Sequence, residues 1–183
     1  MPLIDISYFI GERNIPNTSY PDVSSLIDNL VVVHEREYLI SLLGYELFKL
    51  FEAGLLDNPV AQKWLDIRDG VVYTGMDGRV KQWRGFVNAS TFESPVADYV
   101  YYWYVRNNQS QTAAMGEVKS GSENAFPVSS AYKQSKAWND MAEKSYSLYE
   151  FLQLNYATYP EFQLQSGRSE LRNILTKINA YNL

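Results

Sequence analysis

A run of aromatic residues near the middle of the chain constrains its fold more than any other feature. The stretch SPVADYVYYWYVRNNQSQT, residues 94–112, places five aromatic side chains between Tyr99 and Tyr104. Ser94 and Pro95 stand in the order typical of a helix start, with a capping hydroxyl followed by proline at the first helical position. A helix with this sequence is apolar on nearly every side, so other elements have to surround it.

The covering of this helix can come from the rest of the chain or from a second subunit. Tyrosine combines a large apolar ring with a polar tip, which suits surfaces that are partly dry and partly wet, and the chain contains 15 tyrosines. We therefore expect Tyr101, Tyr102 and Tyr104 to be candidates for a subunit interface. The alternative is that the same rings belong to the core of one subunit, and the sequence leaves both open.

Helical periodicity predicts a mainly α protein: a helical bundle with one small β-hairpin and an N-terminal arm. Asp22, directly after Pro21, is the expected N-cap of a helix that continues to about Leu43. The residues expected to face inward from this helix recur at helical spacing: Val23, Leu26, Ile27, Leu30, His34 and Tyr38.

Glycine and proline divide the other expected helices. Gly44 separates the first helix from a short one that ends at Gly54. Asn58 and Pro59 have the cap-then-proline order of a third helix, which closes at Gly70. The rest of the chain shows two more amphipathic patterns, over residues 129–155 and 169–183.

The segment VVYTGMDGRVKQWRGF departs from the helical pattern. β-branched and aromatic residues flank Asp77-Gly78, a dipeptide typical of a tight hairpin turn. We expect Val71 to Thr74 to pair with Val80 to Arg84. A lone two-stranded ribbon is marginally stable in water, so this hairpin has to pack on helices or on a neighbouring chain.

Two segments lack clear periodicity. Residues 1–20 contain Gly, Pro and Asn near their end and are expected to form an extended arm or an edge strand. Residues 107–128 are polar and contain Gly and Ser, which predicts a long loop. We expect Glu117, Lys119 and Glu123 to lie on a part of this loop that becomes ordered against a neighbouring subunit.

Length and charge limit the classes of protein that fit. The 183 residues suit a single domain over residues 1–183, and the formal net charge of -5 disfavours sequence-specific binding to nucleic acid. The absence of cysteine excludes disulfides and thiolate metal sites and fits a reducing compartment. With no signal-peptide pattern and no apolar run of about 20 residues, we expect a soluble protein made in a cytoplasm, with no membrane partner.

The sequence contains no recognisable catalytic set. The only histidine, His34, lies in HEREY, and Tyr38 stands where a zinc-protease helix would carry its second histidine. Glu35 and Glu37 fall on different sides of a helix, which argues against a shared site. No glycine-rich loop with Lys-Ser or Lys-Thr is present to bind phosphate. We expect no catalytic residues, no cofactor and no metal.

Two other function classes stay open. Aromatic rings can stack on sugars, and a pair of carboxylates about 5 to 10 Å apart could hydrolyse a glycosidic bond, so the chain could be a polysaccharide-acting enzyme or a carbohydrate-binding protein. Arg79, Lys81 and Arg84 alternate around Trp83, a pattern that can bind single-stranded nucleic acid. A hairpin with a charged outer face explains the same residues without a ligand.

Five blocks of the sequence together resemble a known group of proteins. The blocks lie within residues 34–141: HEREYLISLLG, YTGMDGRVKQWRGF, SPVADYVYYWYVR, GEVKSGSENA and KAWNDM. They resemble an uncharacterised family of structural proteins encoded by phages and prophages of Bacteroides-type bacteria. That family is in turn similar, more loosely, to the head-tail adaptor (connector) proteins of tailed phages.

The resemblance implies a small, mainly helical and non-enzymatic protein that forms a ring between portal and tail, with DNA passing through its centre. Its partners would be copies of itself and the portal and tail components. It would be made in the bacterial host cytoplasm and then enter the virion. The adaptor family is defined by helix arrangement more than by motif, so the resemblance assigns no functional residue.

Overall fold

The computed structural model describes residues 2–108, 111–113, 116–118, 130–163 and 167–179. Within them the chain is a mainly α bundle with short β-hairpins, as the sequence predicts. The elements follow in this order: the 3-10 helices η1 (Ile6–Tyr8) and η2 (Gly11–Arg13), α1 (Pro21–Leu43), α2 (Tyr45–Gly54), α3 (Gln62–Asp69), β1 (Val71–Thr74), β2 (Val80–Trp83), α4 (Pro95–Asn107), β3 (Gln111–Ala113), β4 (Gly116–Val118), α5 (Ala131–Leu154), α6 (Pro160–Gln163) and α7 (Ser169–Leu175).

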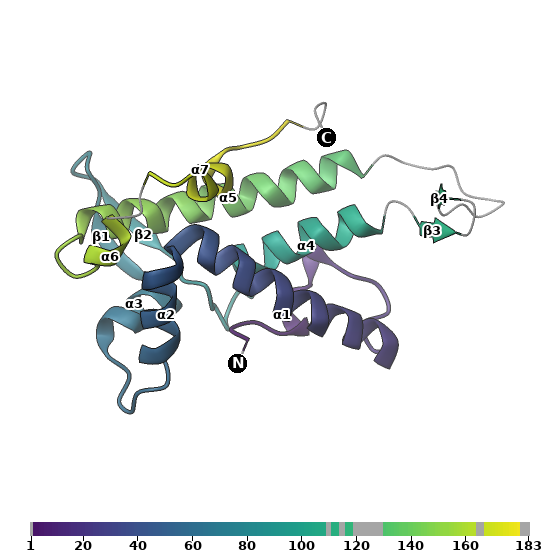
Figure 1. Ribbon diagram of the computed structural model, residues 1–183, viewed down its shortest axis with the longest axis horizontal. Coiled ribbons are helices and arrows are strands. Elements are labelled where there is room, and N and C mark those ends of the chain that lie inside the picture. The colour runs from purple at the N-terminus through teal and green to yellow at the C-terminus, as the bar shows by residue number, and fades with distance from the viewer. Residues whose placement is uncertain (1, 109–110, 114–115, 119–129, 164–166, 180–183) are drawn as a thin grey trace.

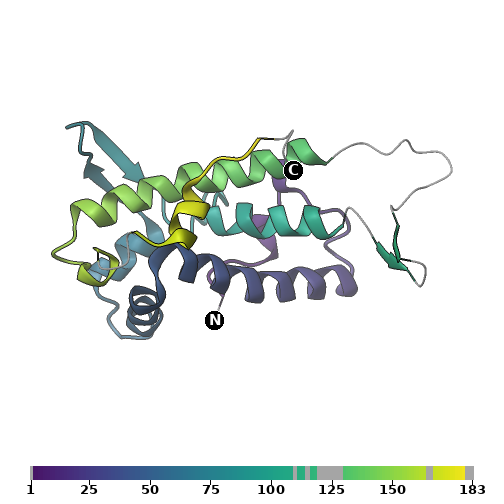
Figure 2. The same cartoon turned by 45° about the horizontal axis from the view of Figure 1, so that its top comes forward.

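Three long helices form the body of the molecule. α4 lies between α1 and α5 and runs antiparallel to both, as Figures 1 and 2 show from two directions. α2, α3 and the β1–β2 hairpin gather at the end of the bundle where α1 finishes and α5 ends (Figure 1). The aromatic helix is therefore the central helix, and its neighbours on both sides belong to the same chain.

The start and the burial of α4 follow the sequence prediction. The Ser94 hydroxyl accepts hydrogen bonds from the backbone N–H groups of Val96 and Ala97, and Pro95 occupies the first helical position. Every residue from Pro95 to Tyr102 is buried. The rings of α4 pack on rings of both neighbours: Tyr99 on Tyr38 of α1, and Tyr102 on Trp138 of α5.

The inward face of α1 differs from the expected one. Ile27 and Tyr38 are buried as expected, but Leu26 is exposed, while Val31 and Glu35 are buried. Positions 27, 31, 35, 38 and 42 form one helical stripe toward α4 and the N-terminal segment. Val31, Val32 and Val33 are consecutive and so lie on different sides of the helix. The positions of apolar residues alone therefore did not identify the side of α1 that faces the core. The helix also starts at Pro21, with Tyr20 as its N-cap in place of Asp22.

The expected hairpin forms with the expected pairing. Val71 pairs with Trp83 and Thr74 with Val80, and the second strand ends one residue before Arg84. Its inner face packs on α5, where the Tyr73 hydroxyl donates to the Ser147 carbonyl over 3.0 Å. The hairpin is thus supported by a helix of its own chain.

One buried carboxylate joins this hairpin to α5. Glu150 accepts a hydrogen bond from the backbone N–H of Met76 in the turn, and its oxygens lie 2.8 and 3.0 Å from the Lys81 ammonium. The Tyr73 hydroxyl lies 3.2 Å from the same carboxylate. Because Lys81 binds Glu150 from the inner face of β2, the ammonium group of Lys81 does not lie on the outer face of the hairpin.

The N-terminal segment is neither an extended arm nor an edge strand. It forms the two short turns η1 and η2, and Asp5 caps the first by accepting from the backbone N–H of Ser7. Apolar side chains of this segment, including Ile4, Phe9 and Ile15, are buried in the common core. Their burial holds the segment against α1 and α4, because folding back removes these side chains from water.

Three boundaries also differ from expectation. α3 begins at Gln62, after Ala61, and not at Pro59. Part of the stretch expected to be a loop over residues 107–128 forms a second hairpin, β3 with β4, while residues 109–110, 114–115 and 119–129 lie outside the described residues. α7 ends at Leu175, before the expected helix end.

The chain leaves helical geometry after α7 because side chains of α5 bind its backbone. The Trp138 indole N–H donates to the carbonyl of Thr176 over 2.8 Å. Asn139 makes two hydrogen bonds with Ile178, one to the carbonyl and one from the N–H. These bonds replace those that a continued helix would make within itself.

Gly54, the last residue of α2, lies against the indole of Trp64. A Cβ atom added there would come within 1.9 Å of the Trp64 Nε1 position. Because Trp64 is buried, Gly54→Ala should lower the free energy of unfolding by about 1 to 3 kcal/mol, the usual cost of overpacking. Urea denaturation measures this. Gly167→Ala is the matched control, since no atom lies within 4 Å of the added Cβ, and equal stability of the two variants would contradict the packing described.

Candidate functional site

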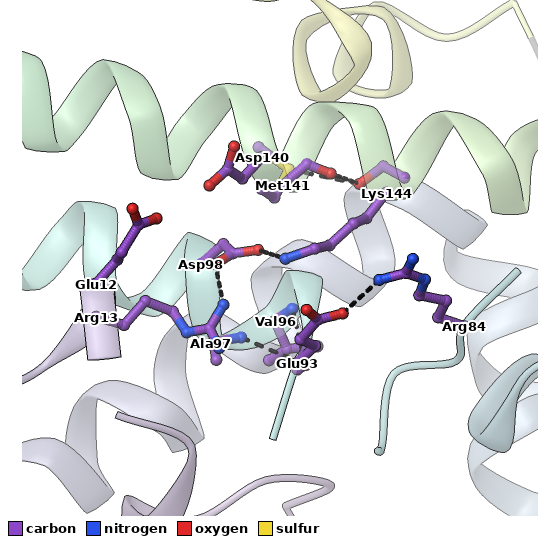
Figure 3. Close-up of polar contacts among 12 residues, drawn as sticks. Glu12, Arg13, Arg84, Glu93, Val96, Ala97, Asp98, Asp140, Met141 and Lys144 are labelled. Atoms are coloured by element: carbon purple, nitrogen blue, oxygen red, sulfur yellow. Dashed lines mark hydrogen bonds and ion pairs between the residues drawn. The ribbon is translucent and has the colours of Figure 1, made fainter. Parts of the chain in front are cut away.

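Two neighbouring hollows open beside α5 and share Asp140. One, of about 410 Å³, lies between α5, the end of β2 and the start of α4, and Arg84, Glu93 and Lys144 contribute to its lining. The other, of about 280 Å³, lies between α5, α4 and η2 and has Tyr132 on its wall. Acidic and basic side chains line both hollows (Figure 3). This surface is therefore the candidate site for catalysis or ligand binding.

A buried carboxylate, Asp98, joins the walls of this surface. It lies in the first turn of α4 and is 1 % exposed. One of its oxygens is 2.7 Å from Arg13 Nη1 and the other is 2.6 Å from Lys144 Nζ, as Figure 3 shows. Arg13 also donates to the Phe92 carbonyl over 2.9 Å. Three segments far apart in the sequence are thereby connected at one carboxylate, which has two cations to balance its burial.

The other acids of the hollows are also opposite cations. Glu93 lies 2.7 Å from Arg84, and Lys136 lies 3.0 Å from Glu12 and 2.8 Å from Asp140. A glycosidase needs one protonated carboxylic acid and one free carboxylate placed across a sugar. Carboxylates that are each engaged by lysine or arginine do not supply that pair. The arrangement is that of a structural brace between elements.

The structure removes the basis for nucleic-acid stacking at Trp83. This side chain is 1 % exposed, its ring packs edge-on against Phe86, and its indole N–H donates to the Ile67 carbonyl over 2.9 Å. Lys81 is directed to Glu150 and Arg84 to Glu93. The interleaved basic and aromatic residues therefore do not form one exposed strip: Trp83 is buried, and Lys81 on the same inner face of β2 is bound to Glu150.

The residues expected at a subunit interface are placed as follows. Tyr101 and Tyr102 are 4 % and 6 % exposed, and Tyr104 is partly buried and stacks on Tyr101. Tyr101 and Tyr102 expose too little surface to contact a second subunit, so we assign them to the core. Tyr104 is more exposed and stays an interface candidate. Glu117 lies in β4, and Lys119 and Glu123 lie outside the described residues.

His34 packs in an aromatic cluster. Its ring stacks on Trp103 with centroids 5.2 Å apart and planes 2° apart, and its Nδ1 lies 3.1 Å from Glu37. Across the described ranges, no group of three or more His, Asp or Glu side chains has a metal-binding arrangement.

Another buried carboxylate, Glu35, lies outside the hollows. Its oxygens accept from the backbone N–H groups of Leu3, at 2.9 Å, and Ile4, at 3.3 Å. Burial raises the pKa of Glu35 to about 7, while these N–H groups act in the opposite direction and only partly compensate. Both oxygens are used to hold the N-terminal segment, which makes Glu35 a structural residue. Glu35 stands four residues after Val31 and three before Tyr38, so helical spacing places it on the same buried side of α1 as these two residues. This spacing was the sequence signal that could have predicted its burial.

Comparison with protein-family models, curated proteins and solved structures gave no significant match. In the part of the chain that the structure describes, none of the helices combines the length and the apolar character needed to cross a bilayer. The function is therefore inferred from the geometry of the chain itself.

Removing the charge of Asp98 should destabilise the fold strongly. Asp98→Asn leaves Arg13 and Lys144 without their shared carboxylate, and breaking a buried ion pair typically costs about 3 to 5 kcal/mol. Chemical denaturation of both proteins measures the difference. Glu93→Gln, the same carboxylate-to-amide change in a more exposed pair with Arg84, should cost about 1 kcal/mol or less. Similar losses for the two variants would contradict the bracing role of Asp98.

Glu35 should give the fold a pH dependence of its own. In the unfolded chain this carboxyl has its ordinary pKa of 4.5, and in the folded chain about 7. Below both values its contribution to stability is fully present; as pH rises from 4.5 to 7 the unfolded chain loses the proton first, so stability falls by about 3 kcal/mol. Unfolding free energies measured from pH 4 to 8 should show this component in the wild type and not in Glu35→Gln. Parallel curves for the two proteins would contradict it.

Proposed function

We propose that the chain is a non-enzymatic structural protein of a phage or prophage, a subunit of the head-tail adaptor type that oligomerises into a ring. The observation that carries the proposal is the outer face of the β1–β2 hairpin. Val72, Met76 and Val80 are exposed by 63 %, 66 % and 76 %, while the inner face is packed on α5. The single chain thus supports one side of the hairpin and leaves an apolar side open.

An open hairpin of this kind is suited to contact with another protein. Strand alternation places Val72 and Val80 on the same side, since they stand opposite Gln82 and Thr74. Among the residues that the structure describes, no third strand pairs with either edge of this two-stranded sheet. Contiguous exposed apolar residues beside unpaired strand edges are characteristic of interaction surfaces. The fixed inner face means that the hairpin is held in place before any partner arrives.

The polar surface beside α5 supports the non-enzymatic part of the proposal. Its acids hold Arg13, Arg84, Lys136 and Lys144 in place, and the pairs of Asp98 with Arg13 and Lys144, of Glu93 with Arg84 and of Glu12 with Lys136 each join different segments. The proposed partners are further copies of this chain and the portal and tail components, first in the bacterial host cytoplasm and then in the virion. The net charge of -5 suits a pore through which DNA slides without tight phosphate contacts.

The proposal predicts concentration-dependent assembly. Sedimentation velocity at rising protein concentration, with and without the portal component, should show a species several times heavier than the 21.1 kDa chain. Electron microscopy of that species should show closed rings. A monomer that persists at every concentration, alone and with the portal, would contradict the proposal.

A further inference from the structure

The β1–β2 hairpin is attached to the rest of the chain at two places. At its base, the buried Trp83 donates from its indole N–H to the Ile67 carbonyl. Nearer the turn, Tyr73 and Lys81 stand opposite each other across the two strands, and both reach Glu150 of α5. The base of the hairpin is thus held in the core, and the part nearer the turn is held on α5.

The turn depends on Glu150 more than the strands do. Its residues, 75–79, bond to one another: the Gly75 N–H donates to the Arg79 carbonyl over 2.8 Å, and the Gly78 N–H donates to the Gly75 carbonyl over 3.0 Å. In the part of the chain that the structure describes, one hydrogen bond joins this turn to a residue outside the hairpin, from the Met76 N–H to Glu150. Glu150 therefore sets the orientation of the turn on α5.

Glu150 holds three parts of the hairpin at once. Its side chain is buried, with the Tyr73 hydroxyl of β1 at 3.2 Å, the Met76 N–H of the turn at 3.2 Å, and the Lys81 ammonium of β2 at 2.8 and 3.0 Å. The hydrogen bond from Lys81 lowers the pKa of Glu150 below its ordinary value. The group is therefore an ionised carboxylate at neutral pH, and both of its oxygens accept.

The same hairpin carries the exposed apolar side chains Val72, Met76 and Val80. We propose that Glu150 is the positioning residue for this surface: by fixing the turn and both strands on α5, it holds the three side chains in one orientation before a partner binds. Ordering a mobile hairpin during association would cost free energy, and a hairpin that is already fixed avoids this cost. This role rests on the proposed function, in which the hairpin contacts other subunits.

Glu150→Ala tests the role, because it removes the acceptor that all three parts of the hairpin share. Lys81 is partly exposed and close to Asp77, so its ammonium keeps a partner and the variant should stay folded. In dilute monomeric protein, amide hydrogen exchange at Gly75 and Met76 should become at least about tenfold faster, while exchange in α4 stays unchanged. Sedimentation velocity should show self-association weakened at least about tenfold, because the freed hairpin has to be ordered on binding.

Two further variants make the comparison specific. Glu143→Ala is the matched control: Glu143 lies about two turns before Glu150 on the same helix and pairs with Lys177, outside the hairpin, over 2.9 Å. It should leave hairpin exchange and association as in the wild type. Glu150→Gln keeps one oxygen that can accept from Met76, so both of its effects should be smaller than those of Glu150→Ala.

Exchange at Met76 and weakening of association that rise together, from wild type through Glu150→Gln to Glu150→Ala, support the positioning role. If Glu150→Ala also loses protection in α4, the comparison of wild type with Glu150→Gln decides. Unchanged exchange at Met76, or faster exchange with unchanged association, overturns the role of Glu150 while the oligomer stands. A wild type that stays monomeric at every concentration overturns both.

Discussion

The burial of an aromatic helix inside its own chain is the constraint on which the rest of the structure depends. α4 is too apolar to face water, so α1 and α5 cover it on both sides. Asp98 fixes the start of this helix by binding Arg13 from the N-terminal segment and Lys144 from α5. The same arrangement buries the N-terminal segment, whose backbone binds Glu35 of α1. The core and the buried carboxylates Asp98, Glu35 and Glu150 thus hold together segments that are distant in sequence.

Local signals predicted the long helices and the β1–β2 hairpin, but not the turns of the N-terminal segment, the β3–β4 hairpin or the tertiary partners of the elements. Ser94-Pro95 marked the start of α4, Asp77-Gly78 marked the hairpin turn, and Gly70 marked the end of α3, because cap and turn chemistry is set by neighbouring residues. The fold of the N-terminal segment depends on contacts with α1 and α4 that no local pattern shows. The inward face of α1 was ambiguous for the same reason, since Leu26 and Val31 are equally apolar and only the packed neighbours decide between them.

The polar surface beside α5 was the least predictable part. Asp98 lies within an aromatic run, and nothing near it in the sequence identifies Arg13 or Lys144 as its partners. Trp83 stands among basic residues in the sequence, yet it is buried against Phe86, while the Arg79 side chain beside the turn is exposed. The aromatic run suggested a surface for a second subunit, whereas its residues Tyr101 and Tyr102 are buried and the hairpin residues Val72 and Val80 are exposed.

The central claim is that the buried part of α4, from Pro95 to Tyr102, is completed within one chain and that association uses surfaces outside it. Hydrogen–deuterium exchange on dilute and on concentrated protein tests this directly, because amide protection reports local stability in each state. The account predicts that α4 is strongly protected in both states, and that β1 and β2 gain protection on assembly. Protection of α4 that appears only in the concentrated protein would contradict it.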